Sequence, residues 1–127
     1  MRPRSTRRLT RARSYLSHMN VAEAQAFVLG MPGVSEHDHF GRPAYRILNA
    51  KGKPSTIFMT LWLDDHRAVL MLNEKEQADL HAQYPEAFFP LPNKWGEKGA
   101  TFVELAHVNA KLLRMGIDLA VAKSLGM

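Results

Sequence analysis

The sequence predicts an α+β domain with two layers, in which helices pack on one face of a mostly antiparallel sheet. Three amphipathic segments with capping residues predict helices near the start, in the middle and at the end of the chain. Between them stand short apolar or alternating segments separated by Gly, Pro and Asn, which predicts strands joined by turns. The 127 residues suffice for one hydrophobic core, and there is no cysteine to supplement it with disulfides.

The first helix is expected over residues 21–29. Asn20 and Glu23 have the spacing of a capping box, in which each side chain accepts a hydrogen bond from the other residue's backbone amide. Gly30 is expected to end this helix in the left-handed conformation, and Pro32 prevents its continuation.

Five short strands are expected after this helix. The first two are separated by Gly41-Arg42-Pro43, and a hairpin turn with a basic tip follows at residues 49–54. Asp64-Asp65 is expected to form the next turn. The expected strands cover residues 37–40, 44–48, 55–63, 68–72 and 101–105.

Two further helices are expected. Asn73 caps one over residues 74–83, and Asn109 caps the last, which continues to about Lys123. Residues 86–99 are expected to form an aromatic anchor followed by an irregular loop, because glycines and prolines follow its paired phenylalanines.

The positive charge lies almost entirely at the start of the chain. The formal charge is +5, from 17 basic and 12 acidic residues, and the first acidic residue is Glu23. Beyond the six early arginines, 11 basic and 12 acidic residues leave a charge of −1, so the folded domain itself is not basic. The six are Arg2, Arg4, Arg7, Arg8, Arg11 and Arg13.

Residues 1–18 are therefore expected to be a disordered basic extension, and residues 19–127 the folded domain. Three interpretations of the extension are open: an arm that binds phosphates, a transit-like peptide, or translation from a start upstream of Met19. The third is favoured because the recognisable domain begins at about Met19.

Several classes of protein are disfavoured by the sequence. No apolar run approaches the roughly 18 residues that span a membrane, and no secretory apolar segment follows the basic start. The absence of cysteine agrees with a cytoplasmic location. No nucleophile-elbow, phosphate-loop, dinucleotide-binding or zinc-protease motif occurs, so we expect no enzyme, no catalytic residue and no cofactor.

Several segments, in order, carry a family resemblance. They read LGMPGV at residues 29–34, HFGRPAY at 39–45, TLW at 60–62, AFFP at 87–90 and WG at 95–96. Together they resemble the MmcQ/YjbR family of small bacterial proteins, from about Met19 to the last helix. The chain departs from the family pattern in the longer linker after the second strand, at residues 51–54.

The resemblance implies a CyaY-like, or frataxin-like, fold and a double-wing mode of binding double-stranded DNA, without a catalytic mechanism. The iron binding of frataxin-like proteins is not supported, because the first helix contains Glu23 as its single acidic residue. The protein is accordingly expected to bind DNA in the cytoplasm. The alternative is a small-ligand or protein-interaction module on the same fold, without a role for nucleic acid.

Two basic segments are candidates for the wings, at residues 49–54 and 92–99. Lysines on such segments neutralise phosphates, which gives salt-sensitive binding with little base specificity. Judged by residue type alone, the lysines are more often solvated surface, and the tryptophan is expected to pack into the core of its own domain. The wing hypothesis requires both segments to project from the same side, with that tryptophan at least partly exposed. The candidate residues are Lys51, Lys53, Lys94, Trp95 and Lys98.

Arg46 and Arg67 are further candidates for DNA contact, because arginine binds phosphate through two parallel hydrogen bonds. Arg42 lies four residues before Arg46 and forms an anion site with it if the two share a face. A structural role is favoured for Arg42, in which it anchors a turn or pairs with Glu36 or Asp38.

The sequence also contains one weak metal-site pattern. His37 and His39 are spaced to share a face of a strand, where a carboxylate of Asp64 or Asp65 is needed to complete a site. This spacing is unspecific, and aspartates are ordinary turn residues. We therefore expect no metal.

Overall fold

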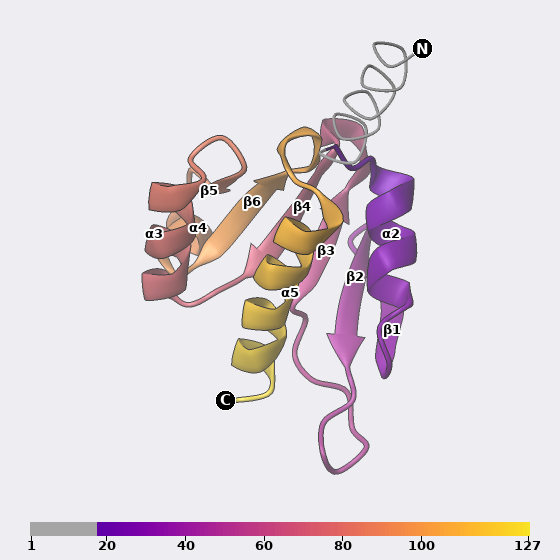
Figure 1. The fold of residues 1–127 in the computed structure, drawn as a ribbon. Helices are drawn as coiled ribbons and strands as arrows, with labels where there is room; N and C mark the ends of the chain where they lie inside the picture. Colours follow the sequence, from indigo (N-terminus) through magenta and orange to yellow (C-terminus); the bar gives the residue numbers. More distant parts are fainter. Residues whose placement is uncertain (1–17) are drawn as a thin grey trace, which may run out of the picture.

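A computed structural model describes residues 18–127 (Figure 1). The expectations for the basic extension, including disorder and a phosphate-binding arm, concern residues outside this part except for His18. The six strands form one antiparallel sheet in the order β1-β2-β3-β4-β6-β5. The strands are β1 (Val34–His39), β2 (Arg42–Ile47), β3 (Met59–Trp62), β4 (Arg67–Met71), β5 (Phe88–Pro90) and β6 (Ala100–Glu104).

The helices form the second layer, and the α+β fold is confirmed. In Figure 1, α2, α3 and α5 lie in front of the sheet, and their apolar residues join the core on that side. The helices are α2 (Val21–Leu29), α3 (Glu74–Gln83), α4 (Lys94–Glu97) and α5 (Ala110–Ser124), with short 3₁₀ turns η1 (Leu63–Asp65) and η2 (Leu105–His107). None of the helices in residues 18–127 combines the length and apolar character needed to cross a membrane.

The main core lies between the sheet and these helices. Tyr45, Met59 and Leu70 from the strands are fully buried there, together with Val28 of α2 and Ile117 of α5. A side chain in place of Gly116 would crowd the side chains of the sheet, so this glycine lets α5 approach the sheet closely.

The capping predictions are confirmed at the helix starts. The Asn20 side chain accepts from the Glu23 amide at 2.7 Å, and the Glu23 carboxylate accepts from the Asn20 amide at 3.0 Å. Asn73 and Asn109 cap α3 and α5 in the same way through their side-chain oxygens. These local signals explain why the bounds of the three long helices agree with the prediction to within about one residue.

Two predictions about local turns are wrong. Gly30 has a right-handed φ of −74°, and it is Gly33 that adopts a positive φ, of 81°. The turn between β1 and β2 is formed by Phe40 and Gly41, both at positive φ, rather than by residues 41–43. Pro43 is tolerated in β2 because it lies beyond the first pair of the β2–β3 ladder, Ala44 with Thr60.

Two predictions about longer segments are also wrong. The expected strand over residues 55–63 is shorter, Met59–Trp62, because the chain before it follows a loop held by an isolated bridge between Leu48 and Pro54. Residues 86–99 contain β5 and α4 in place of an irregular loop.

A polar contact fastens α2 to the first hairpin. The Tyr45 hydroxyl and the Gln25 amide each donate to Glu36 Oε1 at 2.7 Å. These hydrogen bonds, that of Tyr45 first, lower the pKa of Glu36 because they stabilise the ionised carboxylate. Burial, with the Glu36 hydrogen bond second, raises the pKa of Tyr45, so its hydroxyl is a donor at neutral pH.

The lowered pKa of Glu36 predicts a pH-dependent contribution to stability. A carboxyl whose pKa is lower in the folded state stabilises the fold above its unfolded pKa of about 4.3, and this contribution is lost as the pH falls through the lower folded value. Glu36→Gln should therefore have a lower urea midpoint than the wild type at pH 7, and the difference should shrink below about pH 4. Tyr45→Phe, which removes the phenolic donor, should show the same trend. A difference that is constant between pH 7 and pH 3 would contradict this assignment.

Candidate nucleic-acid interface on the open face of the sheet

We call the side of the sheet opposite α2, α3 and α5 the open face. Cross-strand neighbours lie on the same side of a sheet, and the register pairs His39 with Arg42, Ala44 with Thr60, and Trp62 with Arg67. Alternation along the strands then defines the open face. Its strand residues include His39, Arg42, Arg46, Thr60, Trp62, Arg67, Val69, Met71, Phe89, Ala100, Phe102 and Glu104.

A second, smaller apolar cluster lies on the open face. Val69, Leu91, Ala100 and Phe102 are buried in it, and partly buried aromatic residues surround them. The Trp62 ring meets the Phe102 ring edge-on at a centroid separation of 5.0 Å. Within residues 18–127 no long helix covers this cluster, and the aromatic residues at its rim are partly exposed.

The two arginines predicted from sequence lie on this face, but protein groups already bind them. Arg67 donates from Nε to Glu104 Oε1 at 3.1 Å, and its guanidinium lies 5.0 Å from the centre of the Phe102 ring. Arg46 donates from Nη1 to the Ser55 carbonyl at 3.0 Å. Both side chains therefore have a structural role, and the Arg67 charge is balanced locally.

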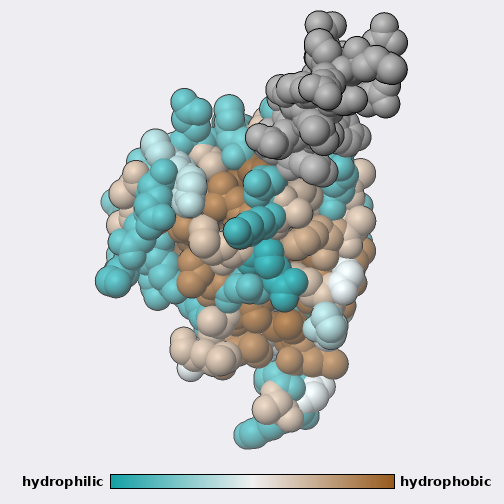
Figure 2. Space-filling view, in the orientation of Figure 1, coloured by the Kyte–Doolittle hydropathy of each residue, from teal (hydrophilic) through white to brown (hydrophobic). Residues whose placement is uncertain are grey.

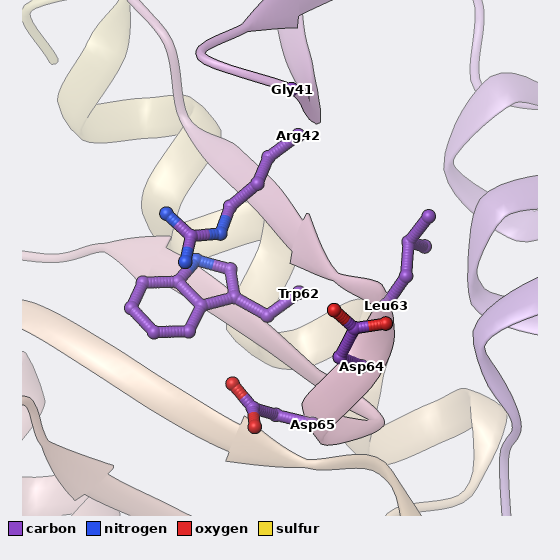
Figure 3. Close-up of a pocket in the computed structure, with 6 residues that line it drawn as sticks. All are labelled: Gly41, Arg42, Trp62, Leu63, Asp64 and Asp65. Atoms are coloured by element: carbon purple, nitrogen blue, oxygen red, sulfur yellow. The ribbon is translucent and has the colours of Figure 1, made fainter.

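Arg42 is placed differently from the prediction. Its guanidinium carbon lies 3.8 Å from the centre of the Trp62 ring, and the residue is exposed (Figure 3). The expected pairing with Glu36 or Asp38 is wrong, because Glu36 faces α2 and Asp38 accepts from the Gly41 amide. Within residues 18–127 no carboxylate forms an ion pair with Arg42.

A small cleft of about 320 Å³ lies beside this stack. Figure 3 shows Asp64 and Asp65 on η1, near the Trp62 end of the cleft, with Gly41 at the other side. Among the described residues, no group of three His, Asp or Glu side chains is placed to hold a metal ion. His37, part of the weak metal pattern, instead lies with Nε2 2.8 Å from Ser35 Oγ.

The α4 segment presents an exposed tryptophan. Asn93 caps this short helix by accepting from the amides of Trp95 and Gly96 at 3.0 and 3.2 Å. Trp95 is 63% exposed, so the expectation that it packs into the core is wrong. Lys94 and Lys98 are exposed on either side of it.

Two glycines and one glutamine hold α4 in place. A side chain at Gly96 would overlap the backbone of Leu91, and one at Gly99, whose φ is 112°, would overlap the Leu72 carbonyl. The Gln77 amide donates to the carbonyls of Gly96 and Ala100 at 2.9 and 3.0 Å. Since Gln77 is only 8% exposed, these bonds fix the junction between α4 and β6 from inside the protein.

The other basic segment is a hairpin loop closed by Asn49. Its side-chain oxygen accepts from the amides of Lys51 and Lys53 at 2.9 and 3.0 Å, and Gly52 supplies a positive φ of 75°. Both lysine side chains are exposed. The loop extends beyond the end of the sheet in Figure 1.

The loop and α4 lie at the same end of the sheet. The chain leaving the loop reaches Phe58, whose carbonyl accepts from the Met71 amide, and Met71 pairs with Ala100, which follows α4. Ile57 and Trp95 also line one groove. The sequence therefore identified two segments that the fold brings to one end.

This groove crosses the open face and has a volume of about 490 Å³. His39, Arg42 and Trp62 stand at one end and Asn93 and Trp95 at the other, over an apolar floor. No carboxylate of the described residues lines it. Arg42 therefore contributes a positive charge at one end of the groove, and Asp64 and Asp65 line the cleft on its other side.

Charged residues are distributed unequally between the two sides of the molecule. Figure 2 shows the helix side, where hydrophilic residues gather over α3 at the left. Three of the 12 acidic residues, Glu74, Glu76 and Asp79, lie on α3. On the strands, Glu104 is the acidic residue that alternation places on the open face, and Arg67 neutralises it. The strand residues of the open face thus include more arginines than acidic residues, while Asp64 and Asp65 of η1 lie at the cleft beside Arg42.

Comparisons of the chain with family models, with curated proteins and with solved structures found no match. The resemblance to the MmcQ/YjbR family, its CyaY-like fold and its mode of DNA binding therefore stay predictions.

The buried position of Gln77 predicts that substituting it lowers the stability of the fold more than substituting an exposed residue of α3 does. Gln77→Leu removes one donor from each of two carbonyls that also accept from the Gly99 and Leu91 amides, so the loss of these two hydrogen bonds should lower the free energy of unfolding by about 1–2 kcal/mol. Urea denaturation at pH 7 measures this. Gln83→Leu, at an exposed position on the same helix, is the control and should change stability by less than about 0.5 kcal/mol. Equal stability of both variants would show that the Gln77 amide does not hold α4.

Proposed function

We propose that this protein is a non-enzymatic, cytoplasmic DNA-binding protein of the MmcQ/YjbR type, which contacts the phosphates of double-stranded DNA. The observation that carries the proposal is the position of its two lysine-bearing segments at one end of the sheet. Lys51 and Lys53 lie on the hairpin loop, and Lys94 and Lys98 flank the exposed Trp95.

The charges of these segments favour contact with phosphates. The loop, residues 49–54, contains two lysines and no acidic residue. In α4 and the residue after it, Glu97 offsets one of two lysines. All four lysines are exposed and none forms an ion pair within the described residues, so a phosphate can reach each of them.

Contacts of this kind give binding with little base specificity. Lysines that contact the DNA backbone neutralise phosphates without contacting base edges, and each contact releases counterions bound to the DNA. For duplex DNA the logarithm of the binding constant falls with the logarithm of salt concentration by about 0.9 per contact. Four lysine contacts therefore predict a slope near −3.6 from the folded domain.

The groove on the open face supports a second candidate function, a module that binds a small ligand or a protein without nucleic acid. Its volume of about 490 Å³ and its apolar floor are within the range of ligand sites. Binding of an apolar partner is insensitive to salt, whereas phosphate binding weakens steeply with it. A titration at several salt concentrations therefore distinguishes the two functions.

The lysines predict a definite change in salt dependence. Lys51→Ala/Lys53→Ala and Lys94→Ala/Lys98→Ala should each weaken binding of a 20-base-pair duplex and reduce the salt slope by about 1.8, as expected for two lost contacts. Fluorescence anisotropy of labelled duplex between 50 and 200 mM NaCl measures affinity and slope.

The matched control is Lys75→Ala/Lys111→Ala, which removes the same charge from α3 and α5. Its salt slope should equal that of the wild type. A full-length variant with all six early arginines changed to serine measures what the extension adds. If both lysine variants bind DNA as the control does, the wing lysines do not contact DNA. If binding is then lost in the arginine variant, it belongs to the extension.

A further inference from the structure

We propose that the groove on the open face binds an unpaired nucleotide, with Trp95 stacking on its base and Arg42 holding a phosphate. The preferred substrate is then a DNA duplex with a single-stranded extension. This inference rests on the proposed function, because the duplex part lies on the lysine-bearing end of the sheet.

Trp95 has the properties of a stacking platform. The residue is 63% exposed, yet its backbone amide donates to the Asn93 side chain, and the Gln77 amide donates to the Gly96 carbonyl near the end of its helix. The backbone is thus already ordered, and a tryptophan side chain has only two χ angles to fix on binding, so little conformational freedom is lost. Unpaired bases stack on such rings whatever their sequence, whereas both faces of a paired base are covered within a duplex.

Arg42 provides the anion contact at the opposite end of the groove. Stacking on Trp62 at 3.8 Å orients its guanidinium plane, and its N–H groups have no carboxylate partner within residues 18–127. Arginine in this arrangement offers paired donors to a phosphate. Arg46 and Arg67 do not compete for this task, because Ser55 and Glu104 bind them.

The groove favours a nucleotide over a purely apolar ligand or an acidic one. Its floor is apolar, through Val69, Met71 and Ala100, which suits the face of a base. Its polar lining includes His39, Arg42 and Asn93 and contains no carboxylate of the described residues. A strand with stacked bases and a negative backbone complements both properties.

The orientation of the groove relative to the lysines favours a duplex with a single-stranded extension. Its Trp95 end lies beside the lysines proposed to hold a duplex, and its Arg42 end lies at the opposite end of β3 and β4. A strand that leaves the duplex therefore passes Trp95 first and reaches Arg42 across the sheet. A blunt duplex has no strand to place there.

The test compares two labelled probes in the full-length protein: a blunt 20-base-pair duplex and the same duplex with a six-thymidine extension. The wild type should bind the extended probe about tenfold more tightly, since one stacked base contributes of this order. Trp95→Ala should remove this preference, because it lowers the affinity for the extended probe much more than the affinity for the blunt duplex. Trp95→Phe, which keeps a ring, should retain most of it, and Arg42→Gln should reduce it.

Tyr84→Ala is the matched control, since it removes a partly exposed ring from the end of α3. It should keep the wild-type preference, and urea denaturation should show that Trp95→Ala is folded. Equal losses of affinity for both probes in Trp95→Ala, or an unchanged preference, would overturn the proposal.

The two proposals fail in different ways. If the lysine variants bind blunt duplex as the wild type does, the proposed function fails, whatever the extension contributes. If the lysines matter but the ratio between the two probes is independent of Trp95 and Arg42, the groove is not a nucleotide site. A self-association that Trp95→Ala abolishes, seen by sedimentation, together with no preference for the extended probe, would assign the groove to a second copy of the chain.

Discussion

The buried amide of Gln77 is the interaction on which the exposed surface depends. From α3 it reaches through the protein to the carbonyls at both sides of the junction between α4 and β6. This contact has two effects: β6 begins in register with β4, and α4 stands on Leu91 with Trp95 turned outward. Buried hydrogen bonds thereby tie this segment to the sheet. Trp95 is exposed because α4 packs against the protein through Gly96 and Leu91 and not through the Trp95 side chain.

The fold was predictable where short-range chemistry determines it. Asn20, Asn73 and Asn109 mark helix starts because their side chains cap amides within the next three residues. The alternation in the strands follows from burying one face against the helices. The β5–β6 pairing was missed, since β5 is a three-residue edge strand whose partner follows ten residues later. A turn with Phe40 at positive φ was also missed, because non-glycine residues seldom adopt that conformation.

The candidate surface was predictable only in part. The lysines of the two segments were found from charge and turn residues, both of which are local features. The pairing of Arg42 with Trp62 brings together residues 20 positions apart on neighbouring strands, and the binding of Arg67 by Glu104 brings together residues 37 positions apart. Trp95 was misjudged because residue type indicates burial, whereas exposure depends on where α4 is anchored. The sequence did contain one signal for α4. Asn93, which follows Pro92, is a helix-capping residue, and it could have led to the prediction of a helix here instead of a loop.

The account makes the open face of the sheet the surface for nucleic acid. Amide and indole NMR spectra of the full-length protein, titrated with the extended duplex, test this most directly, because its two tryptophans both lie on that face. The account predicts that both indole signals and the amides of residues 49–54 and 93–98 shift, while those of α2 and α5 do not. Shifts confined to α2, α5 or the first 17 residues, with unchanged indole signals, would contradict it.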